Sequence, residues 1–357
     1  MQALRLVAGK TAKKRIESEG LTPSLIRMVV GASGGPKWLV LRGLDDFVLG
    51  QWLPQATQKI DLVGSSIGAW RMTIASHPEP RRMLNEFERA YFTFRKEDGS
   101  TPKAVSLASY RILEEVLGQT EREAILSNSN RNLNIVAVRC EGPTASESRF
   151  VEGAGLLAAA SANAISRAAL GRFFRRAVFY SGDTVACSPL WQDFARIDVK
   201  LRQSSVHDAL MASGSIPFAV DPVVDIEGAP PGVYRDGGVI DYHFDVPWSY
   251  ADGIVLYPHF YSHLTPGWFD KLRKNRRAGA DVLDEQLILA PSDEFVAALP
   301  GGRIPDRKNF TELEDNERWA YWRTVIDESY RMAEEFAELL DKPDKLMSSL
   351  KLRRNDE

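Results

Sequence analysis

A serine within Gly64-x-Ser66-x-Gly68 is the residue with the clearest potential for chemistry. A serine hydroxyl is a weak nucleophile, so it must be presented at an exposed turn with a base nearby. Flanking glycines permit a sharp turn between a strand and a helix, and the helix amino end favours developing negative charge. The pattern alone also fits an ordinary strand-to-helix turn, so Ser66 needs partners elsewhere in the chain.

The segment Gly31-Ala32-Ser33-Gly34-Gly35-Pro36-Lys37 could supply those partners. Acyl transfer needs backbone N–H groups aimed at the oxyanion, and a glycine-rich turn offers them without blocking side chains. Pro36 has no N–H, so Gly34 and Gly35 are the predicted donors. Lys37 is a candidate contact for an anionic part of a substrate, or a simple surface residue. A phosphate-binding loop is the competing interpretation, but the segment lacks the ending of a P-loop and the dinucleotide pattern.

Asp236-Gly237-Gly238 is the third motif. An aspartate followed by two glycines forms a tight turn from which its carboxylate can project into a cleft. A plain Asp-Gly turn is the simpler interpretation of this motif when it is taken alone. Gly237 and Gly238 are further candidates for contact with a substrate.

Together the motifs resemble those of patatin-like phospholipases, in which an oxyanion loop, a G-x-S-x-G turn and an Asp-Gly-Gly motif occur in this order. The stretch Ala212–Phe218 (ASGSIPF) also resembles the family, and the likeness covers roughly residues 24 to 262. The resemblance implies that Ser66 is the nucleophile, Asp236 the base of a two-residue dyad, and the amides of Gly34 and Gly35 the oxyanion donors. It also implies a lipid or related acyl-ester substrate.

The oxyanion loop departs from the family pattern. Ala32 and Ser33 replace its first two positions, Trp38 replaces its last glycine, and the basic position is kept as Lys37. These differences affect the expected backbone path and the substrate class, while the two glycines nearest the proline remain.

A Ser-His-Asp triad is the alternative to the dyad. His243, His259 and His263 follow Asp236, so the order serine, aspartate, histidine is available, and His243 is the first candidate. None of the histidines lies in a recognisable active-site motif, which favours the dyad. A carboxylate in this role needs its pKa raised by partial burial.

The elements that must position these residues follow an alternating pattern. Apolar runs predict strands at 25–30, 60–63, 133–140, 177–180 and 253–257, separated by helical stretches. Strands apolar on both faces indicate an α/β fold with a mostly parallel central sheet sandwiched by helices. We expect an N-terminal helical segment (1–23), a hydrolase domain (24–265) and a mainly helical C-terminal extension (266–357). In the extension no strand is expected, and 319–340 predicts a long amphipathic helix packed on the main domain.

Composition narrows the classes of function. The chain has 357 residues, 44% of them hydrophobic, and a net charge of −3, which gives no sign of nucleic-acid binding. Two cysteines, Cys140 and Cys187, favour a reducing compartment. No signal peptide or apolar run of about 20 residues is recognised, so we expect a cytoplasmic protein with peripheral membrane contact left open. No metal or cofactor is expected, and the oligomeric state is left open.

Three functions are therefore compared: a lipid acyl hydrolase, an esterase or thioesterase for small soluble acyl groups, and a weakly active relative that binds lipid or regulates. A wide apolar groove beside Ser66 would favour the first, and a small closed pocket the second. Retention of the serine, the aspartate and the glycine pair argues against the third.

Overall fold

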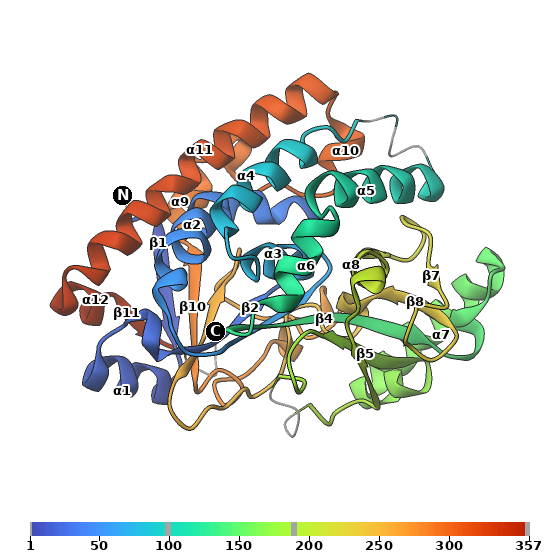
Figure 1. Cartoon of the computed structure of the whole chain (residues 1–357), viewed down its shortest axis with the longest axis horizontal. Coiled ribbons are helices and arrows are strands. Elements are labelled where there is room, and N and C mark those ends of the chain that lie inside the picture. Colours follow the sequence, from blue (N-terminus) through green and yellow to red (C-terminus); the bar gives the residue numbers. More distant parts are fainter. Residues whose placement is uncertain (1, 96, 98–100, 187–190, 354–357) are drawn as a thin grey trace.

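Apolar runs form the centre of one sheet, because their side chains are covered on both faces. The computed structural model describes residues 2–95, 97, 101–186 and 191–353. Its central strands are Ile26–Gly31 (β2), Ile60–Ser65 (β3), Arg131–Cys140 (β4) and Ile254–Pro258 (β9), and nearly all of their residues are buried. They are neighbours in the order β9, β2, β3, β4 and run parallel. The prediction of an α/β fold with a mostly parallel sheet is confirmed (Figure 1).

The other strands make the sheet larger and more mixed than predicted. They are Leu4–Ala8 (β1), Phe174–Tyr180 (β5), Arg196–Lys200 (β6), Val223–Val224 (β7), Val233–Asp236 (β8), Gln286–Pro291 (β10) and Leu350–Leu352 (β11). In the described residues the main order is β11-β1-β10-β9-β2-β3-β4-β5-β6, with β8 paired to β4 and β7. β1 is antiparallel to β10, and both β5 and β8 are antiparallel to β4.

The expectation that no strand lies beyond residue 268 is wrong. β10 is buried at every residue and lies between β9 and β1. Charged residues surround its short apolar run in the sequence, so the run was not recognised as a strand. β1 likewise begins the segment that was expected to be helical, before the helix Lys10–Glu19 (α1). The sheet thus takes strands from all three predicted segments.

Helices flank this sheet (Figure 1). They are Arg42–Phe47 (α2), Ile67–Ala75 (α3), Pro80–Tyr91 (α4), Pro102–Val116 (α5), Gln119–Ser127 (α6), Arg149–Ile165 (α7), Val206–Gly214 (α8), Asp293–Ala298 (α9), Asn309–Glu312 (α10), Asp315–Leu340 (α11) and Pro343–Ser349 (α12). The helix expected from Lys37 begins as a 3-10 helix, Gly35–Leu41, and continues into α2. α3 packs on β2, β3 and β4, and α8 packs on β4 and β8.

The long C-terminal helix packs on the main domain as predicted. Trp322, Val325 and Phe336 of α11 are fully buried. The helix crosses α2 at Gly43, whose N–H donates to the Ser329 hydroxyl at 2.7 Å. A side chain at Gly43 would place its Cβ only 2.5 Å from the backbone nitrogen of Tyr330. Only glycine therefore lets the two helix backbones approach this closely.

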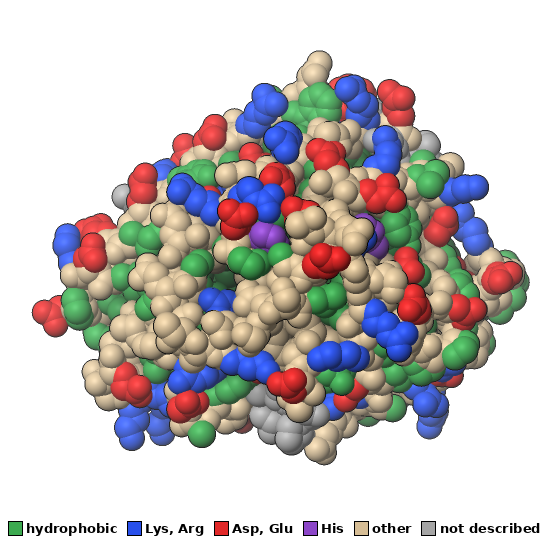
Figure 2. Space-filling model, in the orientation of Figure 1, with side chains coloured by type: hydrophobic (Ala, Val, Ile, Leu, Met, Phe, Trp, Pro, Cys, Tyr) green, Lys and Arg blue, Asp and Glu red, His purple; other side chains and the backbone are tan. Residues whose placement is uncertain are grey.

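Helix α7 carries the main exposed apolar side chains. Phe150, Leu157 and Ile165 are 86%, 70% and 89% exposed, and their spacing places them along one side of the helix. No helix in the described ranges is long and apolar enough to cross a membrane. On the face in Figure 2, acidic and basic side chains are interspersed. Peripheral membrane contact stays open.

Of the two cysteines, Cys140 lies within the described residues. Cys140 lies buried on β4, and burial raises the pKa of its thiol to about 12, so it is not an activated nucleophile. Cys187 lies outside the described residues.

Replacement of Gly43 tests the crossing of α2 and α11. We expect Gly43→Ala to lower the free energy of unfolding by at least about 2 kcal/mol, because the new methyl group meets rigid backbone. Gly171→Ala is the control, since its Cβ would lie an ordinary 3.7 Å from the nearest atom, on Phe194. Denaturant titration of both variants measures the difference. Equal stability would contradict the close crossing.

Candidate active site

The pairing of four strands brings the predicted motifs to one edge of the sheet. Gly31 at the end of β2 pairs with Gly64 at the end of β3. Ser65 then pairs with Val136 of β4, and the next residue of β4 pairs with Asp236 at the end of β8. Segments that are far apart in the sequence therefore end beside one another.

Ser66 lies at a sharp turn between β3 and α3. Its backbone angles, φ 56° and ψ −132°, belong to a region that residues with side chains rarely adopt. A Cβ on Gly68 would lie 2.0 Å from the carbonyl oxygen of Gly31, so the start of α3 rests directly on β2. The Ser66 N–H donates to the Ser213 hydroxyl at 2.9 Å, and that hydroxyl donates to the Val136 carbonyl at 2.6 Å. These contacts hold the strained turn in place.

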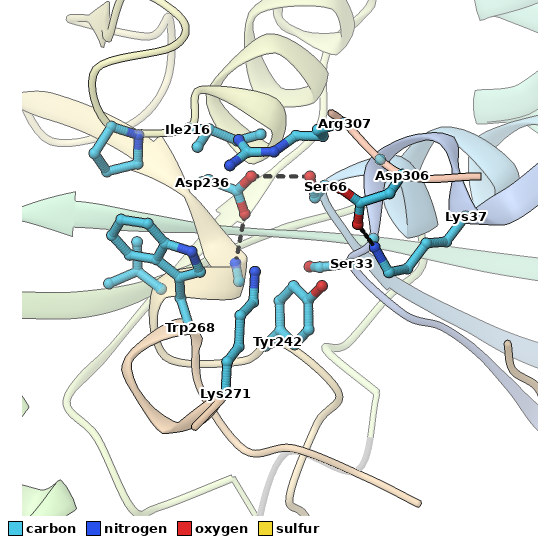
Figure 3. A pocket seen from close by; sticks show the side chains of 15 residues that line it. Ser33, Lys37, Ser66, Ile216, Asp236, Tyr242, Trp268, Lys271, Asp306 and Arg307 are labelled. Atoms are coloured by element: carbon cyan, nitrogen blue, oxygen red, sulfur yellow. Dashed lines mark hydrogen bonds and ion pairs between the residues drawn. The ribbon is translucent and has the colours of Figure 1, made fainter. Parts of the chain in front are cut away.

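The Ser66 hydroxyl donates directly to Asp236. Its Oγ lies 2.8 Å from Oδ2 of the carboxylate, while Oδ1 accepts the N–H of Gly238 at 2.7 Å (Figure 3). Both side chains are largely buried. Burial raises the pKa of Asp236 to about 6, against the opposing effects of the two hydrogen bonds and of the charges on Lys271 and Arg307. The carboxylate is thus a stronger base than an ordinary aspartate.

The predicted oxyanion residues line the same cavity as Ser66. Gly34 and Gly35 are both in its wall, and no hydrogen bond among the described residues occupies their N–H groups. Gly35 has φ 55°, a left-handed conformation that favours glycine. A Cβ on Gly34 would lie 2.6 Å from the ring of Phe260. The two amides remain available to a ligand in the cavity.

Of the three other residues predicted to contact a substrate, two line the cavity and one does not. Lys37 lines the cavity but forms an ion pair with Asp306, so it is neither a free cation nor a surface residue. Gly238 lines the cavity as well. Gly237 does not: a Cβ there would lie 2.3 Å from the Val136 carbonyl oxygen, so this glycine packs against β4.

None of the five histidines lines this cavity. His243, the candidate for a triad, is buried, and its Nδ1 accepts the N–H of Thr265 at 3.0 Å. Burial, with positive neighbours, holds the pKa of His243 well below its usual value. No histidine stands between Ser66 and Asp236, which touch directly.

The expectation of no metal site overlooks one pattern, because His259 and His263 have the four-residue spacing of a metal-binding pair. His259 accepts the N–H of Tyr261 through Nδ1 at 2.8 Å. Within the part of the chain that the structure describes, no group of three or more histidine, cysteine, aspartate or glutamate side chains could hold a metal ion.

The cavity itself is small and charged. It measures about 160 Å³, and its wall contains six residues that no motif indicated, namely Val239, Tyr242, Trp268, Lys271, Asp306 and Arg307. Most of them come from beyond residue 265, where the sequence shows charge but no recognisable pattern. Only the folded chain brings them next to Ser66 (Figure 3).

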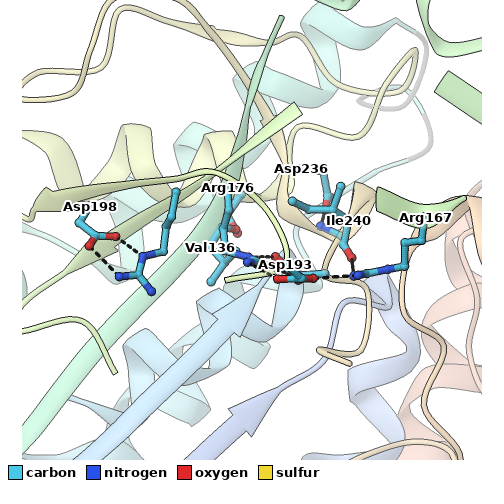
Figure 4. A network of polar contacts seen from close by, with 11 residues as sticks. Val136, Arg167, Arg176, Asp193, Asp198, Asp236 and Ile240 are labelled. Carbon is cyan, nitrogen blue, oxygen red and sulfur yellow. Dashed lines mark hydrogen bonds and ion pairs between the residues drawn. The ribbon is translucent and has the colours of Figure 1, made fainter. Parts of the chain in front are cut away.

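A buried ionic network supports the turn that follows Asp236 (Figure 4). Arg176 on β5 donates to both oxygens of Asp241, at 2.6 and 2.7 Å, and to Asp193 at 2.7 Å. Arg167 donates to the carbonyl of Ile240 at 2.8 Å. Because the N–H of Asp241 also bonds to the Gly237 carbonyl at 2.9 Å, the network fixes the turn and with it the position of the catalytic candidate Asp236.

Comparison of the chain with protein-family models, with curated proteins and with solved structures finds no match. The likeness to patatin-like phospholipases therefore rests on the motifs and remains a prediction.

The raised pKa of Asp236 predicts how its replacement changes stability with pH. A carboxyl whose pKa is raised in the folded state favours folding when protonated, and this contribution is lost as pH rises from about 4 to 6. Asp236→Asn should therefore be more stable than the wild type at pH 7, by about 3 kcal/mol at most.

The advantage of Asp236→Asn should shrink as pH falls from 6 to 4. Thermal unfolding of both proteins across that range measures it, with Asp252→Asn, at an exposed position, as control. A difference that does not change with pH would contradict the raised pKa.

Arg176→Met should destabilise the protein strongly, because Asp241 would be left buried without its partner. We expect a loss of about 3–5 kcal/mol in the free energy of unfolding. Arg27→Met is the matched control: Arg27 donates to both oxygens of Asp252 in the same way, but that aspartate is exposed, so about 1 kcal/mol or less should be lost. Similar losses in the two variants would refute the role given to burial.

Proposed function

We propose that this chain is a serine hydrolase that cleaves an acyl ester through an acyl-Ser66 intermediate, with Asp236 as the base. The observation that carries the proposal is the 2.8 Å hydrogen bond from the Ser66 hydroxyl to Asp236, made at a strained turn that faces a cavity. A nucleophile and a base within hydrogen-bond reach are the minimum that covalent acyl transfer needs.

The proposed reaction has two steps. Asp236 removes the hydroxyl proton as Oγ of Ser66 attacks the ester carbonyl, and the amides of Gly34 and Gly35 receive the oxyanion. The protonated Asp236 then gives the proton to the leaving alcohol. In the second step, Asp236 takes a proton from water as the water attacks the acyl-enzyme carbonyl. It then returns the proton to Oγ of Ser66 as the acyl–oxygen bond breaks and the carboxylic acid leaves. A base with a pKa near 6 suits both transfers, since it is ionised at neutral pH and yet accepts a proton readily.

The size of the cavity favours the esterase alternative over the lipid hydrolase. Pockets for drug-sized ligands usually measure about 300–1,000 Å³. The cavity beside Ser66 measures about 160 Å³ and has charged residues in its wall. A short acyl group fits this space better than a long chain. A regulatory relative without activity has no need for a base with a raised pKa beside a serine.

Replacement of the two proposed catalytic residues tests the function. Ser66→Ala and Asp236→Asn should each lower kcat/KM for a short ester such as 4-nitrophenyl acetate by about 10³-fold or more. The first variant lacks the nucleophile and the second lacks the base that activates it. Asparagine keeps the size of the carboxylate and can still accept the N–H of Gly238. A fluorophosphonate probe should label the wild type at Ser66 and leave Ser66→Ala unlabelled.

His243→Asn provides the control for a triad. Its amide oxygen can replace Nδ1 as acceptor for the Thr265 N–H, so the fold should be retained. We expect most of the activity to remain in this variant. Loss of activity in folded His243→Asn, or labelling at another serine, would overturn the dyad.

A further inference from the structure

Two cations reach the cavity from the C-terminal part of the chain. Lys271 and Arg307 both line it, and in the view of Figure 3 Asp236 lies between them. The ammonium group of Lys271 lies 4.1 Å from the centre of the Tyr242 ring. Neither cation has an ion-pair partner among the described residues. Lys37 differs, because Asp306 already neutralises it.

Like charges are thus held together beside Ser66. Lys271 is exposed along part of its side chain, yet burial of its ammonium group, followed by repulsion from Arg307 and Lys37, lowers its pKa to about 8. For Lys271, the negative charge that offsets this repulsion most is Asp236, followed by Asp306. When Asp236 accepts a proton, that charge is lost and the cavity becomes more positive. An arrangement of this kind favours an incoming anion.

We infer that Lys271 and Arg307 form a binding subsite for an anion, and that the substrate is a short acyl ester carrying a carboxylate or phosphate group. The inference rests on the proposed function, and it adds which ester the site selects. Arginine and lysine are the side chains that pair with both kinds of anion, arginine through two parallel N–H groups and lysine as a point charge.

The volume of the cavity limits the rest of the substrate. A protein cavity of about 150 Å³ holds a molecule the size of benzene. The cavity here measures about 160 Å³, so the part of the ester that lies inside it is about the size of benzene, roughly six heavy atoms. Ile216, Val239 and Trp268 are apolar residues of its wall against which a short acyl chain can pack. Selectivity then comes from charge more than from chain length.

The first experiment measures binding without catalysis. Ser66→Ala protein is titrated with succinate and, separately, with inorganic phosphate by calorimetry. We expect saturable binding of at least one anion, weakened about tenfold or more by Lys271→Met and by Arg307→Met and reduced at high salt. Lys308→Met is the matched control, since Lys308 is exposed and lies outside the cavity wall, and its binding should not change.

The second experiment measures selectivity in the active protein. Ethyl hydrogen succinate is compared with neutral ethyl pentanoate, and 2-acetoxyethyl phosphate with neutral 2-acetoxyethanol, so that the two pairs distinguish a carboxylate from a phosphate. We expect kcat/KM to favour an anionic ester by about tenfold or more. Lys271→Met and Arg307→Met should remove this preference, and Lys308→Met should keep it.

The outcomes separate the inference from the proposed function. Absence of anion binding in Ser66→Ala protein, or equal kcat/KM for charged and neutral esters, would overturn the subsite. Anion binding that depends on Lys271 and Arg307, in a protein that hydrolyses no ester and takes no fluorophosphonate label, would support the subsite and overturn the hydrolase.

Discussion

The direct contact between the backbones of Gly68 and Gly31 is the constraint on which the site depends. A Cβ on Gly68 would come within 2.0 Å of the Gly31 carbonyl oxygen, so α3 can start here only because neither residue has a side chain. The contact joins the end of β2, which leads into the glycine-rich loop, to the turn that presents Ser66. A larger residue at either position would separate the nucleophile from the amides of Gly34 and Gly35. The two glycine motifs are therefore one structural unit.

The position of Asp236 is set by a second group of contacts, made by β8 and the turn that follows it. β8 joins the sheet antiparallel to β4, which carries Asp236 to the level of the Ser66 turn. Beyond it, Arg176 and Asp241 hold the following turn from β5, at a depth where an unpaired charge would be costly. Ser213, on α8, ties the Ser66 N–H to the Val136 carbonyl. The short distance between serine and carboxylate results from these surrounding contacts, since the two residues are 170 positions apart.

How much the sequence predicts depends on whether the information is local. The runs that became β2, β3, β4 and β9 are long enough and apolar enough to be recognised alone. β1 and β10 are no shorter than β9, but Arg5 interrupts the first and acidic residues flank the second, so their burial becomes evident only when they pair in the sheet.

The site follows the same rule. Ser66, Asp236 and the glycine pair belong to motifs that can be recognised in the sequence. Lys271 and Arg307 lie in segments without a recognisable pattern, and only the fold brings them to the cavity. Gly237 was predicted to contact the substrate because it belongs to a motif, yet its role in the fold is to pass close to β4.

The electrostatics of the cavity contain a conflict that an anionic substrate would resolve. Burial raises the pKa of Asp236, while Lys271 and Arg307 lower it and so weaken the proposed base. Cations beside a catalytic carboxylate are a disadvantage for proton removal unless they serve another purpose. An anion bound between them would cancel much of their charge and allow the pKa of Asp236 to rise further toward neutrality. The carboxylate would then be the stronger base when the correct ester is bound, and the same two side chains that select the substrate would leave the empty site less reactive.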